Sequence, residues 1–482
     1  MNDSSCFPQW RPWWNRRRPA LARVRACTLG ELEQRFATVL PATLFPKARA
    51  KLNSRDRVYT PQRTFFCLLW QCLQPGASGR EVVRQLQALL LLVGGTRISP
   101  DDGAYFRARG RLPQAGLTRA LALSAEAVER NLTSVAARLQ GRAVKAVDGS
   151  TVTLPDTPAN AAAYPAVHTS PPCFPLLRVL VLFSLSSAAV LAAAHGNLRQ
   201  SELALLVSLG AQLIKGDIVV GDRGFGCYTM IAWLHSLGVD FIGRTTRRLI
   251  APKANRRLGP NEWLVQWDRP TQAAPWLSAA QWAQVPATLT VRVVRAKFSR
   301  RGFRVREVTV ITTLLDPVLY PADEILEAYL RRWRLEMALD DLKTTLQLEM
   351  LRAHAPQGVA QELLARLVAH NLVRWTLAQA ARVHAVPLER LSFKGALDAL
   401  RHFSLAMSRA RSPRQRQRLW DELLRILATD QIPARPGRRQ PRAVKRKRNK
   451  YPHLSQPRDK FRDRPKRNQR RTRSRARAMG LK

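Results

Sequence analysis

The run from Phe174 to Ala194 constrains the fold of this chain more than any other stretch. Apart from one Arg and a few Ser it is apolar, and its length approaches that of a membrane-spanning helix. Ser184, Ser186 and Ser187 interrupt it midway, where a turn would lie. The run therefore predicts no membrane span but two buried strands joined by a hairpin, Leu176–Leu185 and Ala188–Ala194.

A regular succession of strands and helices surrounds this hairpin. Val144 to Val147 alternates into Asp148-Gly149-Ser150, and Thr151 to Leu154 continues the strand pattern. After the hairpin we expect a helix, a short buried strand, a second helix and another short strand, at Ser201–Ile214, Ile218–Gly221, Tyr228–Leu237 and Val239–Ile242. The order β-β-β-α-β-α-β predicts an α/β fold with a mixed sheet covered by helices.

The first 140 residues carry helical apolar spacing, at Leu29–Leu40, Thr64–Leu73, Arg80–Leu92 and Leu117–Leu139. Ser99 and Pro100 predict the N-cap and the first position of a further short helix. The aromatic and basic segment Tyr105–Arg109 follows, and a helix-turn-helix in which it touches DNA would explain it. An ordinary helical domain with basic surface residues explains it equally well, so both alternatives stay open.

A β-rich insertion is predicted from about residue 245 to residue 312. It contains four tryptophans and then two alternating runs, namely Trp263, Trp267, Trp276 and Trp282, Thr288–Val294 and Phe303–Thr312. A helix from about Pro321 to Leu348 is expected next. Another helix at Gly358–Val383 and a weaker helical pattern as far as Ala428 complete the folded part.

The formal charge of +46 and the pI of about 11.6 concern the partners of the protein rather than its fold. Nucleic acid is the simplest matching polyanion, and an anionic membrane is second. Residues 435–482 hold 21 Lys or Arg against two acids, which predicts a disordered tail that follows phosphates without reading sequence. Six Cys without a CxxC pair, and an N-terminus without an apolar signal core, fit a reducing compartment.

The helix segment from Tyr329 to Lys343 carries two stripes. One is apolar and ordinary, with Leu335, Leu339, Leu342 and Leu346. The other is polar, because Tyr329, Arg332, Glu336 and Lys343 project from one face and Asp340 joins them. It could be a solvated face with ion pairs, or a metal-binding carboxylate flanked by phosphate-binding cations. The helix by itself does not decide between these two interpretations.

Two upstream aspartates give the second interpretation its support. We expect Asp148 and Asp222 to close neighbouring strands of the sheet, where they could converge with Glu336. Three carboxylates without nearby Cys or His favour Mg²⁺ or Mn²⁺. Two such ions roughly 3.5–4 Å apart would activate a water or a 3′-hydroxyl and stabilise the leaving oxygen. Taken singly, each aspartate would be explained by a turn at a strand end.

The three motifs in this order resemble the DDE transposases of bacterial insertion sequences, in the branch with the Y-(2)-R-(3)-E-(6)-K signature. Tyr329, Arg332, Glu336 and Lys343 match that spacing. The first-acid motif DGST begins at Asp148, and the second-acid motif DRGF begins at Asp222. The β-rich insertion before the glutamate also belongs to this branch. The resemblance covers roughly residues 140 to 430.

The resemblance implies an RNase H-like catalytic core whose metal-binding triad is Asp148, Asp222 and Glu336. Tyr329, Arg332 and Lys343 would bind phosphates of the transposon end, and one of the four insertion tryptophans could stack a flipped base. It implies cut-and-paste transposition on double-stranded DNA, by a bacterial cytoplasmic, nucleoid-associated enzyme that is a homodimer when assembled on DNA. Residues 1–140 would bind the DNA end, 141–430 would be catalytic and 431–482 a basic tail.

Two rival functions share these residues. A nuclease on the same core would cut DNA without joining it, and a DNA-binding relative with a silent core would do neither. The presence of all three acids argues against the silent relative. Paired carboxylates also occur in glycosidases, but the basic tail and the cations Arg332 and Lys343 argue against a sugar substrate.

Overall fold

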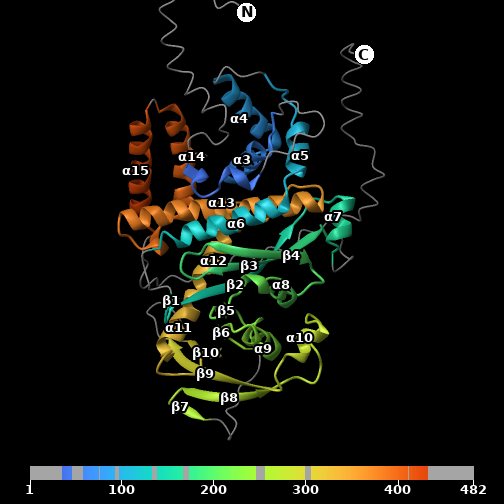
Figure 1. The fold of residues 1–482 in the computed structure, drawn as a ribbon, viewed down its shortest axis with the longest axis vertical. Helices are drawn as coiled ribbons and strands as arrows, with labels where there is room; N and C mark the ends of the chain where they lie inside the picture. Colours follow the sequence, from blue (N-terminus) through green and yellow to red (C-terminus); the bar gives the residue numbers. More distant parts are fainter. Residues whose placement is uncertain are drawn as a thin grey trace, which may run out of the picture.

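One mixed sheet runs through the described part of this computed structural model (Figure 1). The structure describes residues 35–45, 58–74, 76–92, 97–132, 138–166, 173–245, 256–298, 306–410 and 412–432. The predicted basic tail and the start of the predicted helix Leu29–Leu40 lie outside these ranges. Nine of its ten described strands follow the order β4-β3-β2-β5-β6-β10-β9-β8-β7, and the tenth, β1, pairs with β2.

The RNase H-like mixed sheet expected from the sequence is confirmed. Three antiparallel strands form its first half, β2 (Arg142–Thr153), β3 (Leu176–Ser184) and β4 (Val190–Asn197). Two strands parallel to β2 and two helices follow, namely α8 (Glu202–Ser208), β5 (Ile218–Gly221), α9 (Tyr228–Ser236) and β6 (Asp240–Gly243). The loop before β3 contains a short helix, α7 (Pro158–Ala163).

The apolar run around residue 185 forms the predicted hairpin. Ser184 donates its backbone N–H to Ala189 at 2.9 Å, and Ala188 in the turn has a positive φ of 56°. Among the described residues, no helix is both long enough and apolar enough to cross a membrane.

The position expected for Asp148 at a strand end was wrong. Strand β2 continues through Asp148 and Gly149, and its pairing with β3 runs without a break from Lys145 to Thr153. Gly149 pairs with Leu180, so the Asp-Gly step is part of the ladder and not a turn. The partner strand β3, which is distant in sequence, therefore overrides the local turn preference of this dipeptide.

Helices cover both faces of the sheet. Val147, Leu180 and Val219 pack on one face in a cluster with side chains of α8 and α9. On the other face, neighbouring strand residues pack against α6 (Gln114–Glu129), α11 (Ala322–Arg331), α12 (Trp333–Asp340) and α13 (Pro356–Val383). Helices α6 and α13 run side by side across this face (Figure 1).

The β-rich insertion extends this sheet. Its elements are β7 (Arg257–Gly259), β8 (Glu262–Asp268), α10 (Ala279–Ala283), β9 (Thr288–Phe298) and β10 (Arg306–Thr312). Strand β10 pairs antiparallel with β6, so the insertion continues the hydrogen-bond ladder of the core. The insertion and the core therefore share one sheet.

The N-terminal helices lie on the far side of α6 and α13 from the sheet (Figure 1). They are α3 (Pro61–Leu73), α4 (Gly79–Leu92) and α5 (Gly103–Gly110), preceded by the short helix η2 (Ala42–Leu44). Helix α5 begins after Asp102, so the predicted N-cap at Ser99 was wrong. Tyr105 and Arg109 are buried, which withdraws both from a DNA-facing surface.

The predicted helix Leu117–Leu139 also ends early. Helix α6 stops at Glu129, and Arg138–Leu139 forms strand β1, which pairs with the start of β2. The two residues between the strands, Gln140 and Gly141, have φ of 50° and 76°. Positive φ at both central residues defines the tight hairpin turn that matches strand twist. This turn pairs Leu139 with a strand and prevents a continuous helix.

The predicted helix Pro321–Leu348 is divided into three pieces. Helix α11 ends at Arg331, α12 begins at Trp333, and residues Asp341–Thr345 form a π-helical turn, η5. The predicted apolar stripe is confirmed, because Leu335, Leu339, Leu342 and Leu346 are at most 4% exposed. Beyond α13 come the short helix η6 (Leu388–Arg390), α14 (Phe393–Arg409) and α15 (Pro413–Thr429).

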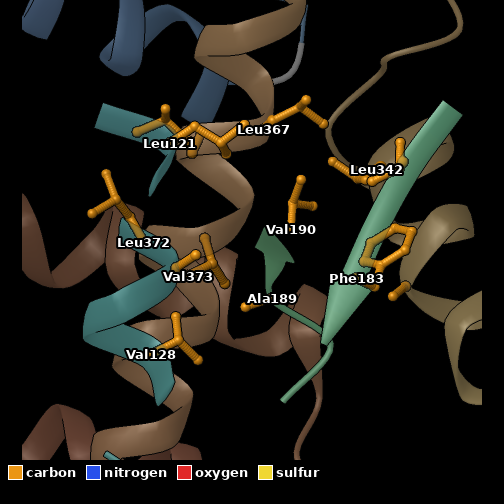
Figure 2. Close-up of a cluster of buried hydrophobic side chains, with 14 of the residues drawn as sticks. Leu121, Val128, Phe183, Ala189, Val190, Leu342, Leu367, Leu372 and Val373 are labelled. Carbon is orange, nitrogen blue, oxygen red and sulfur yellow. The ribbon is translucent and has the colours of Figure 1, made fainter. Parts of the chain in front are cut away.

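The largest apolar cluster joins these layers. Leu121 and Val128 of α6, Phe183 of β3 and Leu367, Leu372 and Val373 of α13 converge there, and Leu342 of η5 points into the same cluster (Figure 2). Burial of Leu342 contributes on the order of 2 kcal/mol. The segment that carries Glu336 is thereby fixed to the sheet and to α13 at once.

Asn371 of α13 provides the test of this packing. Its amide accepts from the Val190 N–H at 2.8 Å and donates to the Val190 carbonyl at 2.9 Å and to Ser124 Oγ at 3.0 Å. Asn371→Ala leaves buried backbone groups of β4 unpaired and should lower the free energy of unfolding by about 2–4 kcal/mol. Ser124→Ala, which removes only one of these contacts, should cost about 1 kcal/mol. Urea unfolding measures both, and equal losses would contradict the argument.

Candidate active site

Asp148, within β2, and Asp222, directly after β5, stand side by side on two parallel strands. The β2–β5 register pairs Val144 with Ile218 and Ala146 with Val220, so two further residues bring Asp148 level with Asp222. Adjacent strands are roughly 5 Å apart. Because side chains alternate along a strand, both aspartates point to the face that α12 covers. Asp222 directly follows β5, as expected.

The two aspartates share a pocket of about 340 Å³ with the polar stripe of α12 and η5. Its lining consists of Asp148, Gly149, Asp222, Arg332, Glu336, Leu339, Asp340 and Lys343. All three predicted acids and two of the three predicted phosphate-binding residues therefore lie around one hollow. Asp340, which belongs to the same polar stripe, is a fourth carboxylate in the lining.

The surroundings of Asp148 disfavour its negative charge. Burial raises the pKa of this carboxyl, and Asp222 raises it further. The Gly149 N–H donates to Asp148 Oδ1 at 2.9 Å and, with Arg332 and Lys343, opposes the rise. The four charged groups thus interact electrostatically across the pocket. Cations are needed to keep two adjacent carboxylates ionised there.

A tight turn holds Asp222. Its Oδ1 accepts the Gly224 N–H at 2.8 Å, which is the self-capping turn typical of Asp. Phe225 is 2% exposed and anchors the turn under the sheet. Gly226 has no room for a side chain, since an added Cβ would lie 1.7 Å from the Arg244 carbonyl oxygen. The DRGF motif therefore fixes the second acid through its turn and its packing.

Arg332 and Glu336 form an ion pair within the pocket wall. Arg332 Nη2 donates to Glu336 Oε1 at 3.0 Å, and the arginine side chain is only 17% exposed. Burial alone would lower the pKa of Arg332, but Tyr329, Glu336 and Asp148 outweigh it and the pKa is raised. The i,i+4 pair expected for a solvated face does exist. Its burial beside Asp148 distinguishes it from a surface pair.

Tyr329 does not line the pocket. It is 9% exposed and belongs to the main core, and the Arg332 guanidinium carbon lies 5.8 Å from the centre of its ring. Tyr329 packs in the core instead, so the four signature residues do not share one pocket-lining face as the sequence predicted. Tyr329 therefore lies against the Arg332 guanidinium on the side of the core. Lys343 reaches the pocket from the π-helical turn η5, an element that often occurs at functional sites.

The donor set suits a hard cation, but the carboxylates are not gathered around a point. Asp148 and Asp222 each use Oδ1 within their own turn or strand, and the described residues offer no hydrogen bond to either Oδ2. Among the residues described, no three Asp, Glu, His or Cys side chains are close enough to hold a metal ion as they stand. Glu336 faces Arg332 instead, which is the expected arrangement for three like charges without a cation. The ligand chemistry fits Mg²⁺ or Mn²⁺ once Glu336 turns from Arg332.

The four insertion tryptophans pack in or against the second core cluster, with α9 side chains. Trp267 is 3% exposed, while Trp263 and Trp282 lie beneath Arg295 and Arg269, each with the guanidinium carbon 5.4 Å from the ring centre. None of the four lines the pocket. The geometry therefore singles out none of them for base stacking.

Comparison with known proteins identifies the class to which this site belongs. Residues 139–372, which include all three acids, match the family model described as the transposase DDE domain. This region is a transposase DDE domain, and the match supports a transposase function for the chain. That family uses divalent metal ions, and transposases act on DNA, which agrees with the charge of +46.

Individual relatives extend the match over most of the chain. The protein is 26% identical over 410 residues to transposase InsG for insertion sequence element IS4 of Escherichia coli (strain K12). That alignment covers 83% of this chain and 88% of the relative. A chain from the cryo-EM structure of a piggyBac transposase synaptic complex with hairpin DNA is a more distant match. Its TM-score is 0.38 and its identity 12%, over 86% of each chain.

Asp341, the first residue of η5, should make stability depend on pH. Burial raises its pKa to about 7, while Arg374 opposes and Asp340 adds to the rise. Because the folded pKa exceeds the unfolded value of about 3.9, the stability linked to this group is complete below that value and is lost as pH rises through about 7. Asp341→Asn escapes this loss. Its stability relative to the native protein should increase by about 1–3 kcal/mol between pH 4.5 and pH 8.

Chemical unfolding of both proteins without divalent ions measures this difference. Parallel stability profiles of the two proteins over that pH range would show that Asp341 is ionised without penalty in the fold.

Proposed function

We propose that this transposase cleaves DNA at the ends of its element and joins them to target DNA, using Asp148, Asp222 and Glu336 as the ligands of divalent ions. The observation that carries the proposal is the shared pocket, in which three carboxylates from separate segments meet two cations. Phosphoryl transfer needs this combination, because acids bind metal and cations neutralise phosphate.

Each pocket residue then has a defined task. Asp148 and Asp222 form a fixed pair, since both are held by backbone N–H groups. Arg332 offers a planar fork to two phosphate oxygens, and Lys343 offers a point charge. Once a phosphate takes Arg332 as its partner, Glu336 is released toward the two aspartates. Bound Mg²⁺ or Mn²⁺ would supply activation of a water or a 3′-hydroxyl and stabilisation of the leaving oxygen.

The remaining parts are proposed to handle the DNA. Residues 1–140 would bind the element end, 141–430 would carry out catalysis, and the basic residues 431–482 would add affinity that is independent of sequence. Two copies of the chain would assemble on paired ends as a homodimer. The bacterial relative favours action in the cytoplasm, on the nucleoid.

The decisive experiment combines purified protein, Mg²⁺ and duplex DNA that carries the element's own ends. Specific cleavage at the junction is expected. A second assay with a precut end and a target plasmid separates the alternatives, because a nuclease would leave the precut end unjoined. Absence of both cleavage and joining, with end binding intact, would favour a silent relative.

The three acids should be individually essential. Asp148→Ala, Asp222→Ala and Glu336→Ala should each reduce cleavage by more than about a hundredfold while DNA binding stays largely intact. Glu336→Asp should also be severe, because the shorter side chain moves the ligand. Asp340→Asn is the matched control, since it removes another carboxylate from the same pocket. A near-native rate in any of the three alanine variants removes that residue from the triad.

The two cations should act on the positioned DNA. Arg332→Ala and Lys343→Ala should lower single-turnover cleavage by about ten- to a hundredfold while metal binding survives, and Arg332→Lys should rescue only partly because the fork is lost. Arg331→Ala is the control, since it breaks a similar pair with Glu327 outside the pocket. If Arg332 served only as a surface ion pair worth roughly 0–1 kcal/mol, activity would be retained and the melting temperature would fall slightly.

A further inference from the structure

A buried carboxylate on α13 joins three segments of the chain. Glu362 is 4% exposed, and its Oε2 accepts from Arg109 Nη2 at 3.1 Å and from the backbone N–H groups of Arg352 and Ala353 at 3.1 and 3.2 Å. Its Oε1 accepts from Arg366 Nη2 at 2.8 Å. Burial alone would raise the pKa of Glu362, but Arg109 and Arg366 reverse the effect and lower it. Four donors therefore surround this carboxylate and favour its ionised form.

The network around Glu362 holds the chain just beyond the catalytic pocket. The Arg366 guanidinium donates to the carbonyl of Leu346, the residue that follows the π-helical turn η5. The two amides bound by Glu362 belong to the same segment, six and seven residues after Leu346. Leu346–Ala353 is thus fixed to α13 at both of its ends. Only two residues separate Lys343, in the pocket wall, from Leu346.

The same segment is bound on its other side by the N-terminal helices. The Gly76 N–H, between α3 and α4, donates to Gln347 Oε1 at 2.8 Å. In return, Arg352 Nη1 donates to the carbonyls of Gly76 and Ala77 at 3.0 and 3.3 Å. Arg109, the buried partner of Glu362, belongs to α5 of the same helical region. The contacts therefore join the region proposed to bind the DNA end to the segment that begins three residues after Lys343.

A π-helical turn needs such support. It is rarer than an α-helical turn, and its wider backbone is stable only where surrounding contacts hold it. Leu342 anchors η5 from the apolar side, and the Glu362 network anchors the chain that leaves it. We propose that Glu362 is a positioning residue. It holds Leu346–Ala353, and with it the nearby Lys343, against the N-terminal helices. A DNA end bound by those helices would then lie at a fixed distance from the three acids of the pocket.

This inference rests on the proposed function for its DNA readout, but it has a structural readout of its own. Glu362→Gln keeps the size of the side chain and removes the charge that satisfies two buried guanidiniums. Gln361→Met is the matched control on the same helix. Gln361 donates to the Leu112 carbonyl at 2.8 Å, so it also binds the N-terminal region, but it does not touch Leu346–Ala353.

The first measurement is hydrogen exchange of the free proteins. Amides in Leu346–Ala353 and at Gly76 should exchange at least tenfold faster in Glu362→Gln than in Gln361→Met. Equal exchange would overturn the proposal whether or not the protein cleaves DNA. Should Glu362→Gln fail to fold, Arg352→Ala replaces it, because this exposed side chain can be lost without burying a charge and its contacts to Gly76 and Ala77 are broken.

The second measurement maps the cleaved phosphodiester on an end-labelled duplex at equal amounts of bound protein. In Glu362→Gln, cleavage at the native position should fall at least tenfold and cuts should spread to neighbouring phosphodiesters. The affinity for the DNA end should change less than twofold. A merely structural role would reduce the amount of folded protein and leave the position unchanged. An unchanged position and rate per bound protein would therefore overturn the proposal. Failure of the native protein itself to cut would count against the proposed function. Hydrogen exchange would still test whether Glu362 holds Leu346–Ala353 against the N-terminal helices.

Discussion

The parallel pairing of β2 with β5 determines where the two aspartates of the candidate site lie. Its register brings Asp148 level with Asp222, so two carboxylates stand about one strand spacing apart. Repulsion between them adds to burial in raising the pKa of Asp148. These two carboxylates require positive charge close to them, and Arg332 and Lys343 supply it from the helical segments that cover the sheet. The helical layer is thus as necessary to the site as the sheet.

Helix α13 holds this layer in position through polar side chains that are buried. Asn371 binds β4, Arg374 donates to the Ser187 carbonyl, and Glu362 with Arg366 binds the chain beyond η5. Apolar packing gives most of the stabilisation but has no direction, so it would tolerate sliding between layers. Hydrogen bonds to particular backbone groups do not, because each displaced partner is left unpaired in the interior. The sheet and the helices are therefore fixed relative to each other where the pocket needs it.

Local patterns in the sequence predicted the elements whose ends are marked by the local sequence. The strand Ile218–Gly221 was predicted with its observed bounds, because a short apolar run ending at an acid has few alternatives. The strand end assigned to Asp148 was wrong, because only the distant β3 keeps Gly149 in the ladder. Tyr329 was expected on the polar face, but it is 9% exposed and packs in the main core, which depends on partners distant in sequence. Side-chain spacing could reveal which residues share a site, but not their partners within it.

The Arg332–Glu336 pair is observed, and the proposed function makes it compatible with the metal-binding interpretation of the polar stripe. Without DNA, Arg332 neutralises Glu336 and keeps the third acid away from two like charges. Under the proposed function, a DNA phosphate competes with Glu336 for Arg332, and a divalent ion competes with Arg332 for Glu336. Each ligand thereby removes an obstacle to the other, and such coupling is reciprocal by thermodynamic necessity. A metal site assembled this way is completed only when DNA occupies the pocket, which limits cleavage to bound DNA without any separate control element.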